Sequence, residues 1–454
     1  MCDRPDGVRT LLHVDKGVTM QEMENAARRL ELGRRNVLKG IGFSALGLMA
    51  VPALASCSTG SGGGGGSSTG SLTFGSNASD AVPKKAYAAF VSAFEKKSKD
   101  TVKTNTVDHN GFQNKINNYL QGSPDDAFTW FAGYRMRYYA DKGLVAPIED
   151  VWAKIGDNFS PALKKASTAS DGKQYFVPNY NYPWGFFYRK SFWAEKGYEV
   201  PQTMDQLETL AKKMQSDGII PIGFADKDAW PACGTFDYLN MRINGYQFHI
   251  DLCDHKESWN SPKLQEVFDT WKMLLPYQDP NSLGMTWQEA AQKLGNKQSG
   301  MMLLGSFITQ QFTDAAVLAD IGFFKFPEVK VEGQDAVEAP IDGLMLSKRG
   351  GENKAAHAML QFMGTGAGQE AYYSVDKSNI MTAKDADTSG YSAFTKELAG
   401  VIADAKNISQ FFDRDALPAM ATNVLEPAMQ SFIKDGTVDL KNIEAQAKTL
   451  YAAQ

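Results

Sequence analysis

Two kinds of hydrophobic pattern alternate along the chain after residue 70. Short runs of apolar and β-branched residues predict strands at residues 72–74, 101–107 and 127–131. Apolar side chains that recur at helical spacing predict helices at residues 86–97, 111–120 and 134–142. Strands that alternate with helices predict a parallel sheet covered by helices on both faces.

The same pattern begins again near residue 182, with the aromatic run at residues 182–188. Further helices are predicted at residues 191–196, 204–216, 262–275, 286–294, 306–312, 355–363 and 443–451. Further strands are predicted at residues 219–224, 300–304 and 339–346. A second α/β lobe is therefore expected to follow the first.

The longest apolar run lies near the N-terminus, at residues 41–55, and is too short to span a bilayer comfortably. Arg34 and Arg35 precede this run and resemble a twin-arginine export signal. The Leu-Ala-Ser-Cys sequence that ends at Cys57 resembles a bacterial lipobox, in which the cysteine receives the lipid. We therefore expect residues 1–56 to be a signal peptide. Residues 57–70, rich in glycine and serine, should form a flexible tether after the lipidated cysteine.

Composition and charge narrow the possible classes of protein. With 43% hydrophobic and 22% charged residues, the chain is neither disordered, collagen-like nor disulfide-dense. Lys and Arg number 47 against 52 Asp and Glu, so no positive excess is available to bind a nucleic acid nonspecifically. A single short apolar run also excludes a polytopic membrane protein.

Two cysteines remain in the exported body, Cys233 and Cys253. Because exported proteins meet an oxidising environment, we expect these two residues to form a disulfide. The alternative is a zinc site at His249, Asp251, Cys253 and His255. Strand-like alternation would place all four on one face, where they cannot surround a tetrahedral ion, so no metal is expected.

Several segments together resemble a known family. They are Gly-Ser-Pro-Asp-Asp at 122–126, Gly-Phe-Phe-Tyr-Arg-Lys at 185–190, the stretch 196–207 with its Pro-Gln-Thr-Met, the glycine-flanked run 300–307, and Ile-Asp-Gly at 341–343. In this order they resemble the extracellular solute-binding proteins of ATP-binding-cassette (ABC) importers, in the carbohydrate-binding family related to maltose-binding protein. The chain departs from the family pattern at Arg189, Met204 and Phe307.

The resemblance implies a two-lobed periplasmic-binding-protein-like α/β fold of type II, in which each lobe is a mostly parallel sheet flanked by helices. It implies that residues 71–178 plus 340–384 form one lobe and residues 184–337 plus 395–454 the other, joined by a hinge near 178–184 and 337–341. It also implies a monomer that delivers a sugar or oligosaccharide to two permease subunits and their ATPase. Together with the lipobox, it places the protein at the outer face of the bacterial cytoplasmic membrane.

Candidate ligand-binding residues lie in the loops that follow the predicted strands, where open α/β sheets bind their ligands. A sugar presents hydroxyl groups at its rim and C–H groups on its faces, so its receptor needs polar side chains beside flat aromatic rings. The candidates are Asn77, Asp80, His109, Asn110, Trp130, Tyr182, Trp184, Trp230, Ser306, Phe307, Asp342, Gly343, Asp413 and Arg414. The helical or apolar surroundings of the other tryptophans predict a core position for Trp152, Trp193, Trp259, Trp271 and Trp287.

Three other functions remain open. A carbohydrate-cleaving enzyme needs only two suitably spaced carboxylates, but no nucleophile motif accompanies them here. The same fold can bind another solute, although anions usually require basic clusters that the candidate loops lack. A purely structural lipoprotein would leave the aromatic loops unexplained. No phosphate-binding motif is present, and the glycines at 364–368 follow a predicted helix rather than a strand, so neither enzymatic activity nor a cofactor is expected.

Overall fold

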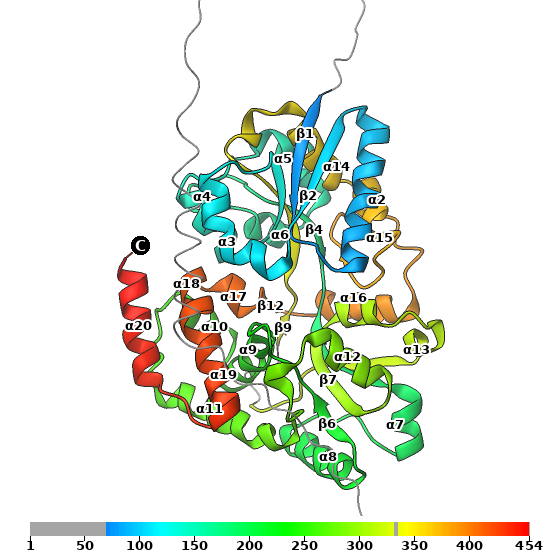
Figure 1. Cartoon of the computed structure of the whole chain (residues 1–454), viewed down its shortest axis with the longest axis vertical. Helices are drawn as coiled ribbons and strands as arrows, with labels where there is room; N and C mark the ends of the chain where they lie inside the picture. Colours follow the sequence, from blue (N-terminus) through cyan, green and yellow to red (C-terminus); the bar gives the residue numbers. More distant parts are fainter. Residues whose placement is uncertain (1–69, 331–334, 454) are drawn as a thin grey trace, which may run out of the picture. The chain divides into compact units, whose positions relative to one another are not determined.

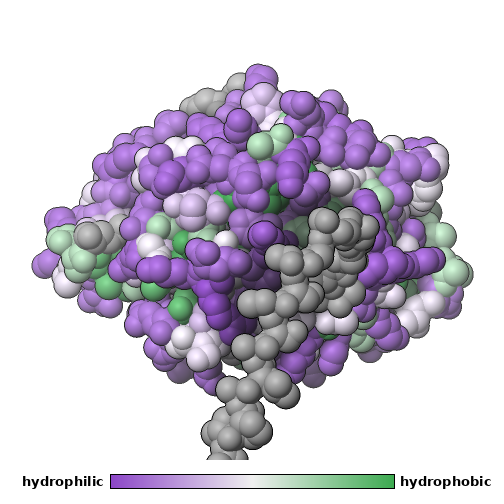
Figure 2. Space-filling model, turned by 90° about the horizontal axis from the view of Figure 1, so that it is seen from above, coloured by the Kyte–Doolittle hydropathy of each residue, from purple (hydrophilic) through white to green (hydrophobic). Residues whose placement is uncertain are grey.

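The computed structural model describes residues 70–330 and 335–453 (Figure 1), and the face of them that Figure 2 shows is mostly hydrophilic. The expected export signal with Arg34 and Arg35, the lipidation site Cys57 and the tether lie outside the described residues. Within the described ranges, no helix combines the length and the apolar character needed to cross a membrane.

The first sheet has six strands in the order β11-β4-β10-β3-β1-β2. They are β1 (Ser71–Ser76), β2 (Thr101–Thr106), β3 (Ala127–Phe131), β4 (Val177–Asn181), β10 (Ile341–Leu346) and β11 (Ile380–Met381). The helices from the same parts of the sequence are α2 (Ala81–Ser98), α3 (His109–Gln121), α4 (Tyr134–Asp141), α5 (Glu149–Ile155), α6 (Pro161–Ala166), α14 (Lys354–Met363) and α15 (Gly366–Tyr373).

Helices cover both faces of this sheet, as the sequence pattern predicts. Phe74 from β1 packs in one core with Phe90 and Phe94 from α2 and with Phe362 from α14. Phe128 and Trp130 from β3 belong to a second core, which α3 and α4 complete on the opposite face. Figure 1 shows α2 and α15 on one side of β1 and β2 and α3 on the other.

One strand of this sheet, β10, runs in the direction opposite to its neighbours, because the chain reaches it from the second sheet. Strands β1, β2 and β3 are parallel, whereas β10 pairs antiparallel with both β3 and β4. The sheet is therefore mostly parallel, but β10 enters it in the opposite direction from the second sheet.

The second sheet has four strands in the order β6-β7-β5-β8, and β5 is antiparallel to both of its neighbours. The strands are β5 (Trp184–Arg189), β6 (Ile220–Gly223), β7 (Ser299–Gly305) and β8 (Ile321–Phe324), and a separate parallel pair consists of β9 (Ala336–Glu338) and β12 (Asn407–Ser409). The accompanying helices are α7 (Lys190–Lys196), α8 (Met204–Ser216), α9 (Pro231–Asn244), α10 (Tyr246–Cys253), α11 (Pro262–Leu274), α12 (Trp287–Gly295), α13 (Ala315–Ala319), α16 (Ala393–Ala403), α17 (Phe412–Asp415), α18 (Pro418–Met420), α19 (Glu426–Asp435) and α20 (Leu440–Ala452).

Very short segments connect the two sheets. Strand β4 ends at Asn181 and β5 begins at Trp184, so only Tyr182 and Pro183 separate a strand of the first sheet from a strand of the second. Strand β9 leads to β10 through Ala339 and Pro340. Side chains at these crossings therefore lie where the two sheets meet.

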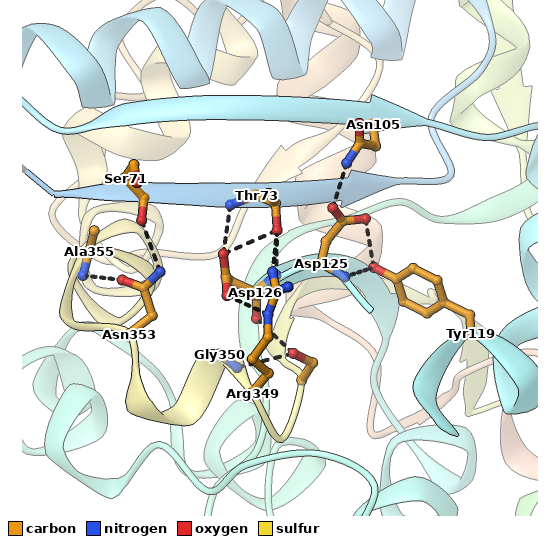
Figure 3. A network of polar contacts seen from close by, with 11 residues as sticks. Ser71, Thr73, Asn105, Tyr119, Asp125, Asp126, Arg349, Gly350, Asn353 and Ala355 are labelled. Carbon is orange, nitrogen blue, oxygen red and sulfur yellow. Dashed lines mark hydrogen bonds and ion pairs between the residues drawn. The ribbon is translucent and has the colours of Figure 1, made fainter. Parts of the chain in front are cut away.

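A polar network stabilises the end of the first sheet at which strands β1 and β3 begin (Figure 3). The carboxylate of Asp126 accepts hydrogen bonds from the backbone N–H of Thr73 at 2.7 Å and from Arg349 Nε at 3.0 Å. Arg349 also donates to Thr73 Oγ1 at 2.8 Å. The network joins the segment after β10 to the starts of β1 and β3. The carboxyl ends of β1 and β3, at the opposite end of these strands, are left free to form a binding site.

The structure corrects two expectations about the cysteines. Residues 246–253 form helix α10 rather than a strand, so His249 and Cys253 lie one turn apart, with Cys253 Sγ 3.8 Å from His249 Nε2. Cys233 lies on α9, and both thiols are free and buried, so the predicted disulfide is wrong. Nowhere in the described part of the chain do three or more His, Cys, Asp or Glu side chains gather to hold a metal ion.

Candidate solute-binding cavity

A cavity of about 270 Å³ lies where the two sheets meet. Its wall includes residues that follow strands of the first sheet, such as Asn77 after β1 and His109 after β2. The second sheet contributes residues such as Trp230, in the loop after β6, and Phe307, which follows β7. The carboxyl ends of the parallel strands thus open onto the cavity, as expected for an open α/β sheet.

Four aromatic rings form one wall, and we call them the aromatic wall: Trp184, Trp230, Phe307 and Phe411. The ring of Trp184 meets Trp230 edge to face at 6.2 Å and Phe307 at 6.0 Å between centroids. Phe411 lies 4.7 Å from Trp184 and 6.2 Å from Trp230. Because each ring contacts others of the group, the wall is a packed and preorganised apolar surface.

A buried arginine adds a charged and polar group to the cavity wall, beside the apolar aromatic wall. Arg414 donates from Nη1 to Asp342 Oδ1 at 2.7 Å and from Nη2 to Tyr182 OH at 2.9 Å. Its guanidinium carbon also lies 4.0 Å from the centroid of the Phe131 ring. These contacts fix the guanidinium in one orientation and neutralise its charge within the cavity wall.

Several polar atoms in the wall have no hydrogen-bond partner among the described residues, although they are buried. They are Asn77 Nδ2, Trp130 Nε1, Trp184 Nε1 and Asp413 Oδ1. The other atoms of these groups are held: Asn77 Oδ1 accepts from Thr129 Oγ1 at 2.9 Å, and Asp413 Oδ2 lies 3.5 Å from Arg135 Nη1. Buried polar groups normally find partners, so these atoms are exceptions within the wall.

Two hydrogen bonds cross the cavity from one sheet's elements to the other's. Asn110 Nδ2, on α3, donates to Asp228 Oδ1, in the loop after β6, at 3.1 Å. Gln288 Nε2, on α12, lies 3.4 Å from Asp80 Oδ2, which immediately precedes α2. The two sides of the cavity are therefore in direct contact in this structure.

Burial shifts the pKa values of the ionisable groups in the wall. Burial raises the pKa of Asp342 despite the attraction of Arg414, whereas the pKa of Arg414 rises because its attraction to Asp342 and Tyr182 outweighs burial. The 2.7 Å contact between Arg414 Nη1 and Asp342 Oδ1 indicates an ion pair. Burial and the nearby Arg414 lower the pKa of His109 to about 4, so this imidazole is neutral at physiological pH.

The structure brings nearly all the predicted site residues to this one cavity. Asn77, Asp80, His109, Asn110, Trp130, Tyr182, Trp184, Trp230, Phe307, Asp342, Asp413 and Arg414 line it. Their contact with a ligand stays a prediction.

Two predicted residues do not line the cavity. Ser306 is buried and donates its hydroxyl to the backbone oxygen of Ser378. Gly343 packs against β4, where a Cβ atom would lie 2.0 Å from the Val177 oxygen. Gly343 is therefore needed for close packing of two strands.

Other lining residues were missed by the sequence analysis. Among them are Tyr180, Asp228, Trp287, Asn379 and Phe411. Trp287 was expected in the core; it belongs to the core cluster, but it also meets Phe307 edge to face at 5.0 Å at the cavity. Asp228 precedes Trp230 in a loop after a predicted strand, so the rule that found Trp230 could also have found it.

The family model of bacterial extracellular solute-binding proteins matches residues 77–370. The chain belongs to this family. It is similar to the bacterial solute receptor AcbH, with 45% identity, 84% of this chain and 100% of that chain covered, and a TM-score of 0.82. It is also 29% identical over 249 residues to the diacetylchitobiose-binding protein DasA of Streptomyces coelicolor, covering 52% of this chain and 55% of DasA.

Two further comparisons support the family and the fold. An uncharacterised ABC transporter extracellular-binding protein of Pyrococcus horikoshii is 26% identical over 348 residues, covering 74% of this chain and 77% of that protein. Maltose-bound MalE3 of T. maritima has a TM-score of 0.69 at 16% identity, covering 84% of this chain and 99% of that chain. The expected type II periplasmic-binding-protein fold is thereby confirmed, and the family is one of extracellular solute receptors.

Proposed function

We propose that this protein is the sugar receptor of an ABC importer and that it binds one neutral pyranose ring in the cavity between its two sheets. The observation that carries the proposal is the meeting of the aromatic wall with polar side chains such as Asn77, His109 and Asp342 in one small cavity. Aromatic rings suit the C–H faces of a sugar, and the polar side chains suit its hydroxyl groups.

Charge and size support a small neutral ligand. Arg414, the arginine in the cavity wall, is already paired with Asp342, so it offers little free positive charge to an anion. Asp80, Asp228 and Asp413 also line the cavity and would repel a phosphate or carboxylate. A volume of about 270 Å³ lies at the small end of the range for ligand sites, which favours one sugar ring over a long oligosaccharide.

Similarity to solute receptors of known preference suggests a first candidate ligand. AcbH is described as having an exclusive substrate preference for β-D-galactopyranose, and this chain is 45% identical to it over 84% of its length. DasA is named for diacetylchitobiose, but DasA is less similar to this chain, and the match covers a smaller share of both proteins. We therefore infer that β-D-galactopyranose is the first ligand to test.

Closure of two lobes would couple binding to transport. We assign residues 71–178 plus 340–384 to one lobe and 184–337 plus 395–454 to the other, with a hinge at the short crossings near 178–184 and 337–341. Contacts across the cavity, such as Asn110 with Asp228, would stabilise the closed form. Permease subunits would recognise that form, and a lipid on Cys57 would keep the receptor at the outer face of the cytoplasmic membrane.

Calorimetry on residues 58–454 tests the proposal. The panel contains D-galactose, D-glucose, a disaccharide, an amino acid and a sugar phosphate, and thermal shifts are recorded in parallel. A ligand at a hundred times its Kd should add about 2.7 kcal/mol of stability. Saturable binding of a neutral monosaccharide without product release supports the receptor. Binding of only the charged solutes would overturn the choice of ligand, and turnover of the disaccharide would indicate an enzyme.

A further inference from the structure

Phe411 has an unusual backbone for a residue with a large side chain. Its φ is 91° and its ψ is 139°, outside the left-handed helical region that non-glycine residues with positive φ normally occupy. The other non-glycine residues with positive φ in the described ranges have φ values between 53° and 69°. Such a conformation is strained and persists only where the surroundings impose it.

The surroundings hold both peptide groups next to Phe411. The backbone N–H of Gln410 donates to Asp415 Oδ2 at 2.8 Å, and the backbone N–H of Phe412 donates to Asp237 Oδ2 at 2.7 Å. Gln410 Oε1 accepts from the backbone N–H of Ile341 at 3.0 Å, which attaches the same segment to β10. The strained residue is therefore fixed from both sides by groups that do not themselves line the cavity, the buried Asp237 and the partly buried Asp415.

The result of this strain is the position of one ring. Phe411 is only 4% exposed, and its ring closes the aromatic wall against Trp184 and Trp230. Two residues later, Asp413 and Arg414 line the cavity from the same segment. Any relaxation of Phe411 would move a ring out of the wall and shift these polar groups.

We propose that Phe411 is a specificity-determining residue: its ring is the end wall that limits the cavity to a single sugar ring. The inference rests on the proposed function and adds the element that sets ligand size. Without the ring, the cavity extends past Trp184 and Trp230 by the volume of a phenyl group. Asp237 and Asp415 are positioning residues, because they act only by holding the backbone of this segment.

The test compares three substitutions, Phe411→Leu, Phe411→Ala and Phe411→Gly, by calorimetry with D-galactose and with the disaccharide lactose. We expect the native chain to bind D-galactose and to reject lactose. In the Ala and Gly variants, D-galactose should bind about tenfold more weakly or worse, and lactose should gain measurable affinity. Leu keeps apolar volume and should change both affinities in the same directions by smaller factors.

The Ala and Gly variants also test the strain itself. Both remove the ring, so they share the enlarged cavity and differ only in backbone freedom. Glycine normally destabilises a chain relative to alanine, but it tolerates a φ of 91°. Phe411→Gly should therefore melt at a higher temperature than Phe411→Ala. Lys99→Gly and Lys99→Ala form a matched pair at an exposed position with a φ of 69°, and neither should alter sugar binding.

The measurements on the native chain and on the variants distinguish failure of the proposed function from failure of the proposed role of Phe411. If the native chain binds no sugar, the proposed function fails and this inference fails with it. If the native chain binds D-galactose but every folded variant keeps its selectivity, only the end-wall role is wrong. Native binding of lactose as tight as that of D-galactose also overturns the end wall. Should the Ala and Gly variants not fold, the Leu variant alone decides between these outcomes.

Discussion

The buried Arg414 and the partly buried Asp342 form an ion pair with 2.7 Å between Nη1 and Oδ1, and the pair joins α17 to the second residue of β10. Both residues line the cavity, so the contact serves the fold and the site together. It anchors the segment after β12 to the strand that returns from the second sheet to the first. A movement of one sheet relative to the other would therefore change the geometry of this ion pair.

Removing one partner of this pair should be costly. Asp342→Ala leaves a buried guanidinium without its carboxylate, and we expect it to reduce the free energy of unfolding by about 3 kcal/mol in urea titrations. The control is Lys212→Met, which breaks the exposed helical pair of Lys212 with Glu208 at 2.8 Å. That change should cost less than about 0.5 kcal/mol. Equal losses in the two variants would contradict the structural role of Asp342.

Sequence patterns predicted most of the fold because its strands and helices are short and strongly periodic. They could not predict that β10 is antiparallel to β3, since the partners are distant in the sequence and only the crossing at Pro340 brings them together. Helix α10 was mistaken for a strand because polar residues alternate there. In the structure, His249 and Cys253 are both buried on one helical face, a spacing of four that alternation conceals.

The site was predictable where it follows parallel strands and unpredictable where tertiary packing decides. Asn77 and His109 follow β1 and β2 directly, so the rule for open α/β sheets located them. Phe411 reaches the cavity only through a strained turn held by Asp237 and Asp415, which leaves no trace in the pattern. Ser306 has the right place in the sequence, but its hydroxyl is bonded to Ser378.

The hydrogen bond between Asn110 and Asp228 should contribute to affinity through closure. Asp228→Ala removes a contact between the two sides of the cavity, and we expect the Kd for the sugar to rise about three- to tenfold, as for the loss of one hydrogen bond. Calorimetry measures the Kd, and small-angle scattering should show a smaller compaction on binding. Asn105→Ala is the matched control, because Asn105 donates to Asp125 at 2.6 Å and neither residue lines the cavity (Figure 3). An equal effect of the two substitutions would refute the closure role.

Glu426 should make stability depend on pH. Burial, with a further contribution from Asp413, raises its pKa from 4.5 to about 7, so the folded state binds more protons than the unfolded state between these values. Stability should therefore fall as the pH rises from 4.5 to 7 and stay lower above it. Glu426→Gln avoids this loss, and we expect it to be more stable than the native chain by about 2–3 kcal/mol at pH 8 and equal to it at pH 4. Urea titrations at both values measure the difference.

A control removes the effect of other groups from that comparison. The pKa of His109 is lowered to about 4 by burial and Arg414, which contributes stability that is lost as the pH falls from 6.5 to 4. This term is common to both proteins and cancels in their difference. The exposed Glu352→Gln should show the native pH dependence. A Glu426→Gln variant with the native dependence would show that Glu426 is ionised at no cost.

The two free thiols should be inert in the folded protein. Cys233 and Cys253 are buried, and burial raises the pKa of both thiols well above the usual value. A thiol reagent should label neither residue until the chain is unfolded, and a reductant should leave the melting temperature unchanged. Intact-mass analysis after alkylation under denaturing conditions should count two added groups in residues 58–454. A fall in melting temperature on reduction would show that the two cysteines form a disulfide after all.

Two tryptophans of the aromatic wall should differ in what they contribute. Trp184 is 2% exposed, and its backbone oxygen accepts a hydrogen bond from the hydroxyl of Tyr238 at 2.6 Å, so Trp184 supports the core as well as the cavity. Trp230 is partly exposed at the cavity, which suits it to stack on a sugar face. Trp184→Ala should therefore lower the free energy of unfolding by about 3–5 kcal/mol and weaken binding.

Trp230→Ala should weaken sugar binding by about tenfold or more while costing clearly less stability than Trp184→Ala, because less of its surface is buried. Trp230→Phe keeps a flat ring and should recover part of the affinity. Calorimetry and urea titration of the same preparations separate the two effects, and the fluorescence change on binding should be smaller in both Trp230 variants. Unchanged affinity in Trp230→Ala would move the stacking role to another ring of the wall.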